Sequence, residues 1–269
     1  MTRIDRRALF TSGAAAALLA ASGLSAATPR AGGRLRLALP KGGDSFDLVW
    51  RGAVFDTLTE VGPNGVLRGE LATGWTSNRD ARVWDFELRG DVAFHDGTVF
   101  GAADFVASLA GAAIGVIHAE TTDLTHVRLE LAAPNPDLPY LLADPALVMQ
   151  SPTGQGTGLY RTERLQSGRH FLGQRVAQHY KDGQAGWLDS LEIIVIPDAN
   201  IRAEALRDGY VDVAELPEPK GLRGRGDFIY HPSKDNMALA ARTGVGMPKV
   251  IGARGPLDDG RIGERWWMG

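Results

Sequence analysis

The histidines and one glycine-rich stretch are the residues whose types and spacing come nearest to a recognisable chemistry. No two of the six histidines lie four residues apart, and the sequence lacks a P-loop, a G-x-S-x-G elbow and an H-E-x-x-H pair. His118 and Glu120 have the His-x-Glu spacing of the zinc deaminases, which also require two cysteines, and the chain has no cysteine. The sequence therefore predicts no cofactor, no metal site and no enzyme of these classes.

Residues 154–158, Gly-Gln-Gly-Thr-Gly, have the composition of a phosphate-binding loop. Such a loop normally leads into a helix, whose first N–H groups and dipole hold the anion. Here residues 159–161 follow, and their sequence Leu-Tyr-Arg is typical of an extended strand, so phosphate binding is not favoured. One enzyme alternative stays open, an exported hydrolase or metalloenzyme using His95 and Asp96, although no further catalytic group accompanies that pair.

The composition indicates a globular protein without a nucleic-acid partner. The chain has 269 residues, 44% of them hydrophobic, which is enough for one large domain or two small ones. Its 29 Lys and Arg residues are balanced by 32 Asp and Glu residues, and no basic cluster is present to meet a phosphate backbone. Because cysteine is absent, disulfides and thiolate chemistry are excluded.

Residues 1–27 are expected to be an export signal. A charged start is followed by a short apolar run over residues 13–24 and by a small-residue cleavage site ending at Ala27. The Arg6-Arg7 pair before this weakly apolar run indicates the twin-arginine route, although an ordinary secretory signal with a chance arginine pair is the alternative. Cleavage would leave a periplasmic protein without a membrane span.

The elements that must position any site alternate between strands and helices. Residues 34–39 and 83–88 alternate apolar and polar side chains, as half-buried strands do, and residues 191–196 have the composition of a central strand. Residues 102–113 place apolar side chains at helical spacing, and Asp198 is placed to cap a helix that runs to Arg207. The predicted fold class is therefore α/β, with connections too irregular for a barrel.

Two loop-rich stretches indicate where the chain divides. Residues 151–158 separate two stretches of regular pattern, and residues 217–226 contain two prolines, three glycines and three basic side chains. We therefore expect one structural region over residues 28–216. Residues 217–269 are expected to form a surface segment and a short C-terminal helix.

A series of motifs in fixed order carries a resemblance to a known family. The most specific part is Trp-Asp-Phe-Glu-Leu-Arg at residues 84–89 followed by Phe-His-Asp-Gly-Thr at residues 94–98. The chain resembles the family 5 extracellular solute-binding proteins, the receptors of ABC importers for dipeptides, oligopeptides and nickel. Further matches are Leu-Ala-Thr-Gly-Trp at residues 71–75, Gly-Thr-Gly-Leu-Tyr at residues 156–160 and the Gly-x-Val-Asp element at residues 209–212.

The resemblance covers roughly residues 34–216 and implies a fold of the periplasmic-binding-protein type. In detail it implies the first lobe of a type II protein of the peptide-binding cluster, with a mixed sheet. Family members are longer and carry a second lobe that closes over the ligand, so we expect that second lobe to be absent from this chain. Because the acidic residue that meets a peptide's amino group belongs to that lobe, tight peptide binding by a monomer is not expected.

The loop after the first strand is expected to face the ligand cleft, as it does in the family. In this loop Asp44 could meet a cationic group, and Ser45 lies beside it. Phe46 or Trp50 could form an aromatic platform. For the two aromatic residues, packing against the sheet is an equally good interpretation.

Two further groups of residues are candidates for binding. Thr157, Gly158 and Tyr160 could supply backbone or hydroxyl contacts near the crossing between lobes, although a purely structural role is the alternative. Trp266 and Trp267 near the end of the sequence either fold back onto the exposed inner face or anchor another chain, and they are the candidate partner-binding residues.

Three functions of different classes follow from these observations. The preferred one is a periplasmic binding subunit of an ABC importer, with a small-molecule or peptide ligand and permease subunits as partners. The second is an exported interaction module that docks on another exported protein without binding free solute. The third is the exported enzyme, for which the sequence offers no convergent catalytic groups.

Overall fold

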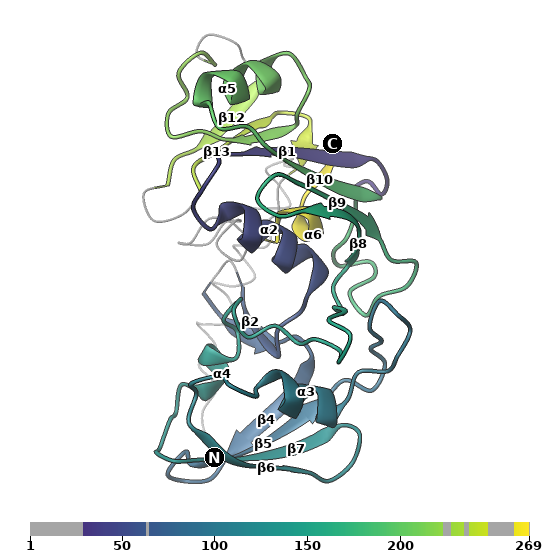
Figure 1. Ribbon diagram of the computed structural model, residues 1–269, viewed down its shortest axis with the longest axis vertical. Helices are drawn as coiled ribbons and strands as arrows, with labels where there is room; N and C mark the ends of the chain where they lie inside the picture. Colours follow the sequence, from purple (N-terminus) through teal and green to yellow (C-terminus); the bar gives the residue numbers. More distant parts are fainter. Residues whose placement is uncertain (1–28, 63–64, 223–226, 234–236, 247–260, 269) are drawn as a thin grey trace, which may run out of the picture.

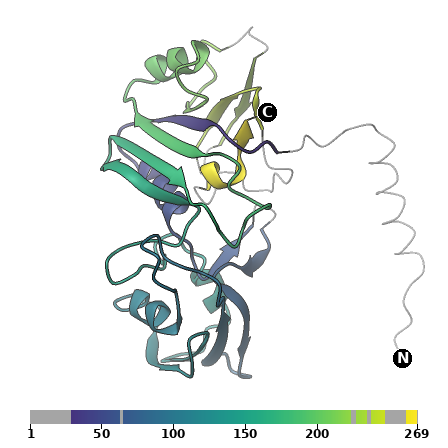
Figure 2. The ribbon, with the colours of Figure 1, turned by 90° about the vertical axis from the view of Figure 1, so that its right-hand side faces the viewer.

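The computed structural model describes residues 29–62, 65–222, 227–233, 237–246 and 261–268 (Figure 1). The expected export signal lies outside these residues. Within them the chain forms two halves that lie end to end along the long axis of the molecule (Figure 1 and Figure 2). We call the half built around the seven-stranded sheet the large half, and the half built around the four-stranded sheet the small half. No helix in the described ranges is long and apolar enough to cross a membrane.

The large half is built on a mixed sheet in the order β12-β13-β11-β1-β10-β9-β8. Strand β1 lies in the middle and pairs in parallel with β10 and β11, while the outer pairs are antiparallel. The predicted α/β class with a mixed sheet is thereby confirmed. The strands are β1 (Arg34–Leu39), β8 (Tyr160–Gln166), β9 (His170–Arg175), β10 (Ser190–Val195), β11 (Val213–Glu215), β12 (Phe228–His231) and β13 (Leu239–Arg242).

Helices cover both faces of this sheet. Helices α2 (Ser45–Val54) and α6 (Ile262–Arg265) pack on one face, and α5 (Ala199–Arg207) packs on the other. The alternation of β1 directs Leu35, Leu37 and Leu39 into the core beneath α2. The carboxylate of Asp198 accepts hydrogen bonds from the N–H groups of Asn200 and Ile201, as the expected cap of α5.

The small half has a separate core beneath an antiparallel sheet in the order β4-β5-β7-β6. Trp84, Phe86 and Leu88 of β5 point into this core, as the alternation predicts. The helix expected over residues 102–113 is shorter and ends at Ser108. The elements of this half are β4 (Ala72–Ser77), β5 (Val83–Leu88), α3 (Ala102–Ser108), β6 (Val116–Thr121), β7 (His126–Leu131) and α4 (Leu138–Leu141). Two short ribbons complete the structure, β2 (Thr59–Val61) with β3 (Leu67–Gly69) and β14 (Val245–Gly246) with β15 (Trp267–Met268).

The described residues after 217 differ from the expected surface segment. Strand β13 pairs with β11, and its residues Leu239, Ala240 and Ala241 are fully buried. This stretch is rich in alanine and lacks the clear alternation by which a strand is recognised, so its place in the sheet depends on the open edge of β11. The short C-terminal helix is present as α6, and it too is buried.

Candidate functional site

The carboxyl ends of the parallel strands form the first part of the candidate site. In α/β sheets, ligands bind in the crevice outside these ends. Here the strands β1, β10 and β11 end at Leu39, Val195 and Glu215. The stretch expected as a loop after the first strand is helical from Ser45 onward, because α2 begins there. Asp44 is the exposed N-cap of this helix, and Ser45 lies half-buried beside it. We call this region the carboxyl edge.

Glu215 adds a carboxylate to the carboxyl edge that the sequence motifs do not indicate. Burial raises the pKa of Glu215, and the hydrogen bond with Ser45 and the charge of Arg202 only partly offset this rise. Its Oε2 atom is buried without a hydrogen-bond partner among the described residues. The nearby guanidinium of Arg202 donates to backbone carbonyls of Glu215 (2.7 Å) and Ile196 (2.6 Å). Glu215 is the last residue of β11, and its position at the end of a parallel strand is the sequence signal that could have identified it.

The two aromatic residues of the predicted site pack against the protein. Phe46 is 5% exposed and belongs to the core beneath the sheet. Trp50 is half-buried, and its ring centroid lies 5.8 Å from that of Phe55 and 6.1 Å from that of Phe171. Its indole N–H donates to the carboxylate of Asp47 (2.8 Å). The packing alternative therefore describes both rings in this structure.

The remaining predicted ligand residues lie at the other end of α2. The Gly158 N–H donates to the Val54 carbonyl (2.9 Å), at the last residue of that helix. A ten-residue helix is about 15 Å long, so α2 separates this group from Asp44 and Ser45. A Cβ atom on Gly158 would lie 2.6 Å from the carbonyl carbon of Val54, so glycine permits the close approach.

Thr157 and Tyr160 are buried at the same end of α2. The Thr157 hydroxyl donates to the carboxylate of Asp56 (3.0 Å). The Tyr160 hydroxyl lies within hydrogen-bond distance of the carbonyls of Leu188 (3.0 Å) and Gly263 (2.7 Å). Both hydroxyl groups are thus engaged inside the protein, and a direct ligand contact by either side chain stays a prediction.

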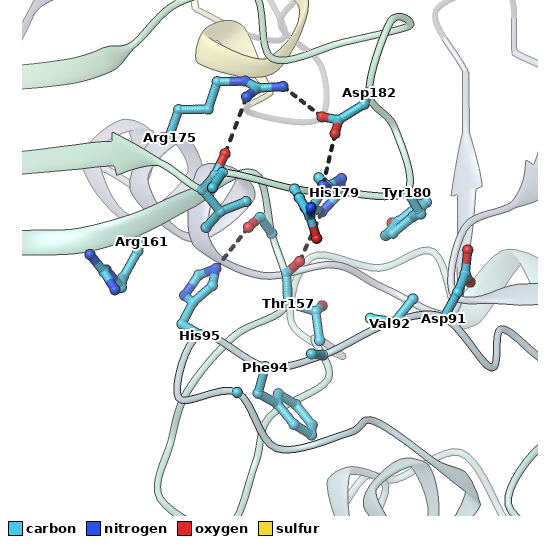
Figure 3. A pocket seen from close by; sticks show the side chains of 16 residues that line it. Asp91, Val92, Phe94, His95, Thr157, Arg161, Arg175, His179, Tyr180 and Asp182 are labelled. Carbon is cyan, nitrogen blue, oxygen red and sulfur yellow. Dashed lines mark hydrogen bonds and ion pairs between the residues drawn. The ribbon is translucent and has the colours of Figure 1, made fainter.

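Between the two halves lies a pocket of about 780 Å³, which we call the junction pocket (Figure 3). The small half contributes residues 91–97, and the large half contributes residues from the ranges 157–161 and 175–182. Thr157 and Gly158 thus line a pocket, and Asp44 is not among the residues that line it. The polar and charged side chains of its lining are Asp91, His95, Thr157, Arg161, Arg175, Gln178, His179, Tyr180 and Asp182.

Hydrogen bonds to the backbone hold the two histidines of the junction pocket. The Nε2 atom of His95 lies 2.7 Å from the Gly158 carbonyl, and that of His179 lies 2.9 Å from the Thr157 carbonyl (Figure 3). Burial lowers the pKa of His95, although its bond to the Gly158 carbonyl acts in the opposite direction. His95 is therefore neutral near pH 7. His179 also stacks on Tyr180, with ring centroids 4.3 Å apart.

A buried group of charges lies next to the junction pocket and joins the halves. The ammonium of Lys181 lies 3.2 Å from a carboxylate oxygen of Asp56 and 2.8 Å from one of Glu264, and it also contacts Glu70. Arg261 contacts the same three carboxylates. These side chains are at most 12% exposed. We call these five residues the buried ion cluster.

The charges in this cluster support one another. Burial alone would raise the pKa of Asp56, but Lys181, His179 and Arg261 hold it well below the usual range. Burial would lower the pKa of Lys181, and its carboxylate neighbours instead hold it well above the usual range. Asp56 and Lys181 are therefore both charged near pH 7. In the described ranges, no three His, Asp or Glu side chains are grouped so that they could hold a metal ion.

The two residues of the enzyme alternative have separate structural partners. The carboxylate of Asp96 accepts hydrogen bonds from the Thr98 hydroxyl (2.6 Å) and N–H (3.0 Å) and from the Thr153 hydroxyl (3.0 Å). It thereby organises the turn after His95, whose ring is held by Gly158. Both side chains therefore have structural roles, Asp96 in the turn and His95 in its contact with Gly158.

The C-terminal tryptophans fold back into the large half. Trp266 is fully buried in the core beneath the sheet, and Trp267 is 4% exposed in β15. The sequence left two alternatives, folding back onto the protein or anchoring another chain, and in the structure both tryptophans fold back. The expectation that Trp266 and Trp267 form a partner-binding anchor is therefore corrected, because neither indole is exposed.

Comparison with known proteins gives one family and many structural neighbours. The profile of the family described as "Bacterial extracellular solute-binding proteins, family 5 Middle" matches residues 66–225. No characterised protein was matched by sequence. Among solved structures, the periplasmic binding protein AgaA from A. tumefacien R10, in complex with agropinic acid, shares 26% identity at a TM-score of 0.64. That match covers 69% of this chain and 44% of AgaA.

Two further structures support the fold. The periplasmic binding protein DppA from Helicobacter pylori, in complex with the peptide STSA, has 20% identity and a TM-score of 0.66, with 75% of this chain and 51% of DppA covered. A nickel ABC transporter protein from Bacillus halodurans has 23% identity and a TM-score of 0.64, with 74% and 46% covered. The chain spans about half the length of these proteins.

Proposed function

The chain belongs to the bacterial extracellular solute-binding proteins of family 5, and we propose that it is the ligand-binding subunit of an ABC importer for peptides or similar small solutes. The observation that carries this proposal is the family match over residues 66–225, more than half of the chain. The ligands named for AgaA and DppA, agropinic acid and a peptide, are the kinds of solute we propose. Export through the twin-arginine signal to the periplasm is part of the same proposal.

We place the solute at the carboxyl edge. Asp44 is exposed there and can meet a cationic group of the ligand, and Ser45 can supply a hydroxyl. Glu215 lies behind Ser45 and carries an oxygen that has no partner among the described residues. A ligand amine would therefore find two carboxylates of different exposure at the start of α2.

The test begins with native mass spectrometry of the mature protein, gently purified from the exported fraction. A small molecule released from the protein would support the proposal and identify the solute class. An empty protein found with a different polypeptide would contradict it and favour the interaction module.

Calorimetry with the released compound then tests the carboxyl edge. For a cationic ligand, Asp44→Ala should weaken binding by about tenfold, which corresponds to the loss of roughly 1.4 kcal/mol. The matched control is Asp80→Ala, which removes an exposed carboxylate from a turn of the small half. Unchanged affinity in Asp44→Ala would remove Asp44 from the site.

A further inference from the structure

Four charged side chains line the junction pocket, and two of them neutralise each other. The guanidinium of Arg175 lies 2.6 Å from the carboxylate of Asp182. Its other N–H groups donate to the carbonyls of Gly186 (2.5 Å) and Val176 (3.1 Å). Arg175 and Asp182 therefore shape the wall of the pocket and leave little charge for a ligand.

The other two charges, Arg161 and Asp91, are unpaired. Both side chains are exposed, and neither makes a hydrogen bond or an ion pair with another residue of the described ranges. They come from different halves, Arg161 from β8 and Asp91 from the loop after β5. Figure 3 shows them at opposite ends of the pocket, with His95 and Thr157 between them. The pocket thus has a positive end and a negative end.

The middle of the pocket is neutral and partly apolar. A carbonyl can only accept a hydrogen bond, so the Nε2 atom of His95 carries the proton that it shares with Gly158. The Nδ1 atom of the same neutral ring is then an acceptor, and no described residue donates to it. Val92 and Phe94, which are 4% and 3% exposed, form an apolar floor.

From this arrangement we infer that the junction pocket binds a short linear zwitterion, with its carboxylate at Arg161 and its ammonium at Asp91. An anion would leave Asp91 without a partner, and a cation would leave Arg161 without one, whereas a zwitterion meets both. An N–H group between the two charges of the ligand would find its acceptor in His95. The volume of 780 Å³ lies within the range of about 300–1,000 Å³ that small-molecule pockets occupy.

This site does not depend on the importer role. It lies at the end of α2 opposite to Asp44, and it is formed by both halves rather than by the carboxyl edge of one sheet. A ligand that contacts Arg161 and Asp91 at once also bridges the halves. Binding should therefore raise the midpoint of thermal unfolding, since a ligand that binds the folded state stabilises it.

The test uses triglycine, its N-acetyl derivative and its C-terminal amide, titrated into the whole protein near pH 7 by calorimetry. The wild type should bind triglycine several-fold more tightly than either blocked form. In Arg161→Gln the preference for the free carboxylate should disappear while the preference for the free amine remains. In Asp91→Asn the preference for the free amine should disappear while the preference for the free carboxylate remains. Because both side chains are exposed and unpaired, neither variant should disturb folding.

A matched control variant makes the result specific. Arg164→Gln removes an exposed arginine from the same strand, outside the lining of the pocket, and it should bind triglycine as the wild type does. Equal binding of the three compounds by the wild type, or no binding at millimolar concentration, would overturn the inference. Binding lost in Asp44→Ala but kept in Arg161→Gln and Asp91→Asn would also overturn it, while supporting the importer proposal.

Discussion

Lys181 is a single ammonium that lies among three buried carboxylates. Its contacts reach Asp56 and Glu70, near the junction of the halves, and Glu264 in α6. A buried carboxylate without a partner is costly, because the attraction of the opposite charge is what compensates for its lost hydration. At the scale of the residue, Lys181 therefore determines whether this part of the interior can remain charged.

Replacing Lys181 should destabilise the protein strongly. We expect Lys181→Met to lower the free energy of unfolding by about 3–5 kcal/mol, because it removes the ammonium that contacts three buried carboxylates. Urea unfolding followed by circular dichroism measures this change. Lys220→Met is the control, since that side chain is 86% exposed, and it should change stability by less than about 0.5 kcal/mol. A loss below about 1 kcal/mol in Lys181→Met would show that the cluster is not stabilising.

The same cluster predicts how stability depends on pH. The folded-state pKa values of Asp56 and Glu264 lie below the ordinary values of 3.8 and 4.5. Their contribution is therefore present above those ordinary values and is lost as the pH falls through the folded pKa values. Stability should decrease between about pH 5 and about pH 3, and Asp56→Asn should have a shallower slope there. Unfolding midpoints measured across this range test the prediction, and equal slopes would contradict it.

Helix α2 joins the two candidate sites at the scale of the element. Its first turn presents Asp44 and Ser45 at the carboxyl edge, and its last residue, Val54, receives the N–H of Gly158 at the junction pocket. Its apolar face packs on the sheet through Phe46 and Val49. Because the two sites lie at opposite ends of one short rigid helix, they are held at a constant separation.

Helix α6 and the tryptophan after it close the core on the same face of the sheet. Since Trp266 is fully buried, Trp266→Ala should lower the free energy of unfolding by about 3–5 kcal/mol and leave the oligomeric state unchanged. Urea unfolding and light scattering measure the two properties. Tyr210→Ala, which truncates a side chain that is 71% exposed, is the control and should change neither. A changed assembly state with unchanged stability would instead favour the partner anchor.

At the scale of the whole molecule, two cores meet at one junction. The large half is centred on β1 and the small half on β5, and each has its own set of buried apolar residues. The buried ion cluster and the hydrogen bond between His95 and the Gly158 carbonyl connect them. Because the ion cluster is buried, separating the halves would leave its charges without their partners, and the halves should unfold together.

Truncating either core tests this coupling. Leu37→Ala in the large half and Phe86→Ala in the small half should each destabilise by about 2–5 kcal/mol. Each variant should retain a single unfolding transition in which circular dichroism and tryptophan fluorescence coincide. Two separate transitions in Phe86→Ala would show that the large half folds without the small one.

The sequence by itself determined the features that depend on residues close together along the chain. The alternation of β1 and β5, the Asp198 cap and the ordered family motifs each depend on neighbouring residues, so the fold class and the family could be predicted. Within the predicted site, the place of Asp44 and Ser45 after the first strand was implied by the family resemblance, whereas the helix that begins at Ser45 was not predicted from local pattern.

Only the tertiary structure decided which distant groups meet. Lys181 reaches Asp56 and Glu70 across more than one hundred residues, and Arg161 and Asp91 reach one pocket from different halves. The structure likewise buried Trp266 and separated Gly158 from Asp44 by the length of α2. Burial and the pairing of charges are properties of a residue's surroundings in space, which periodicity along the chain does not record.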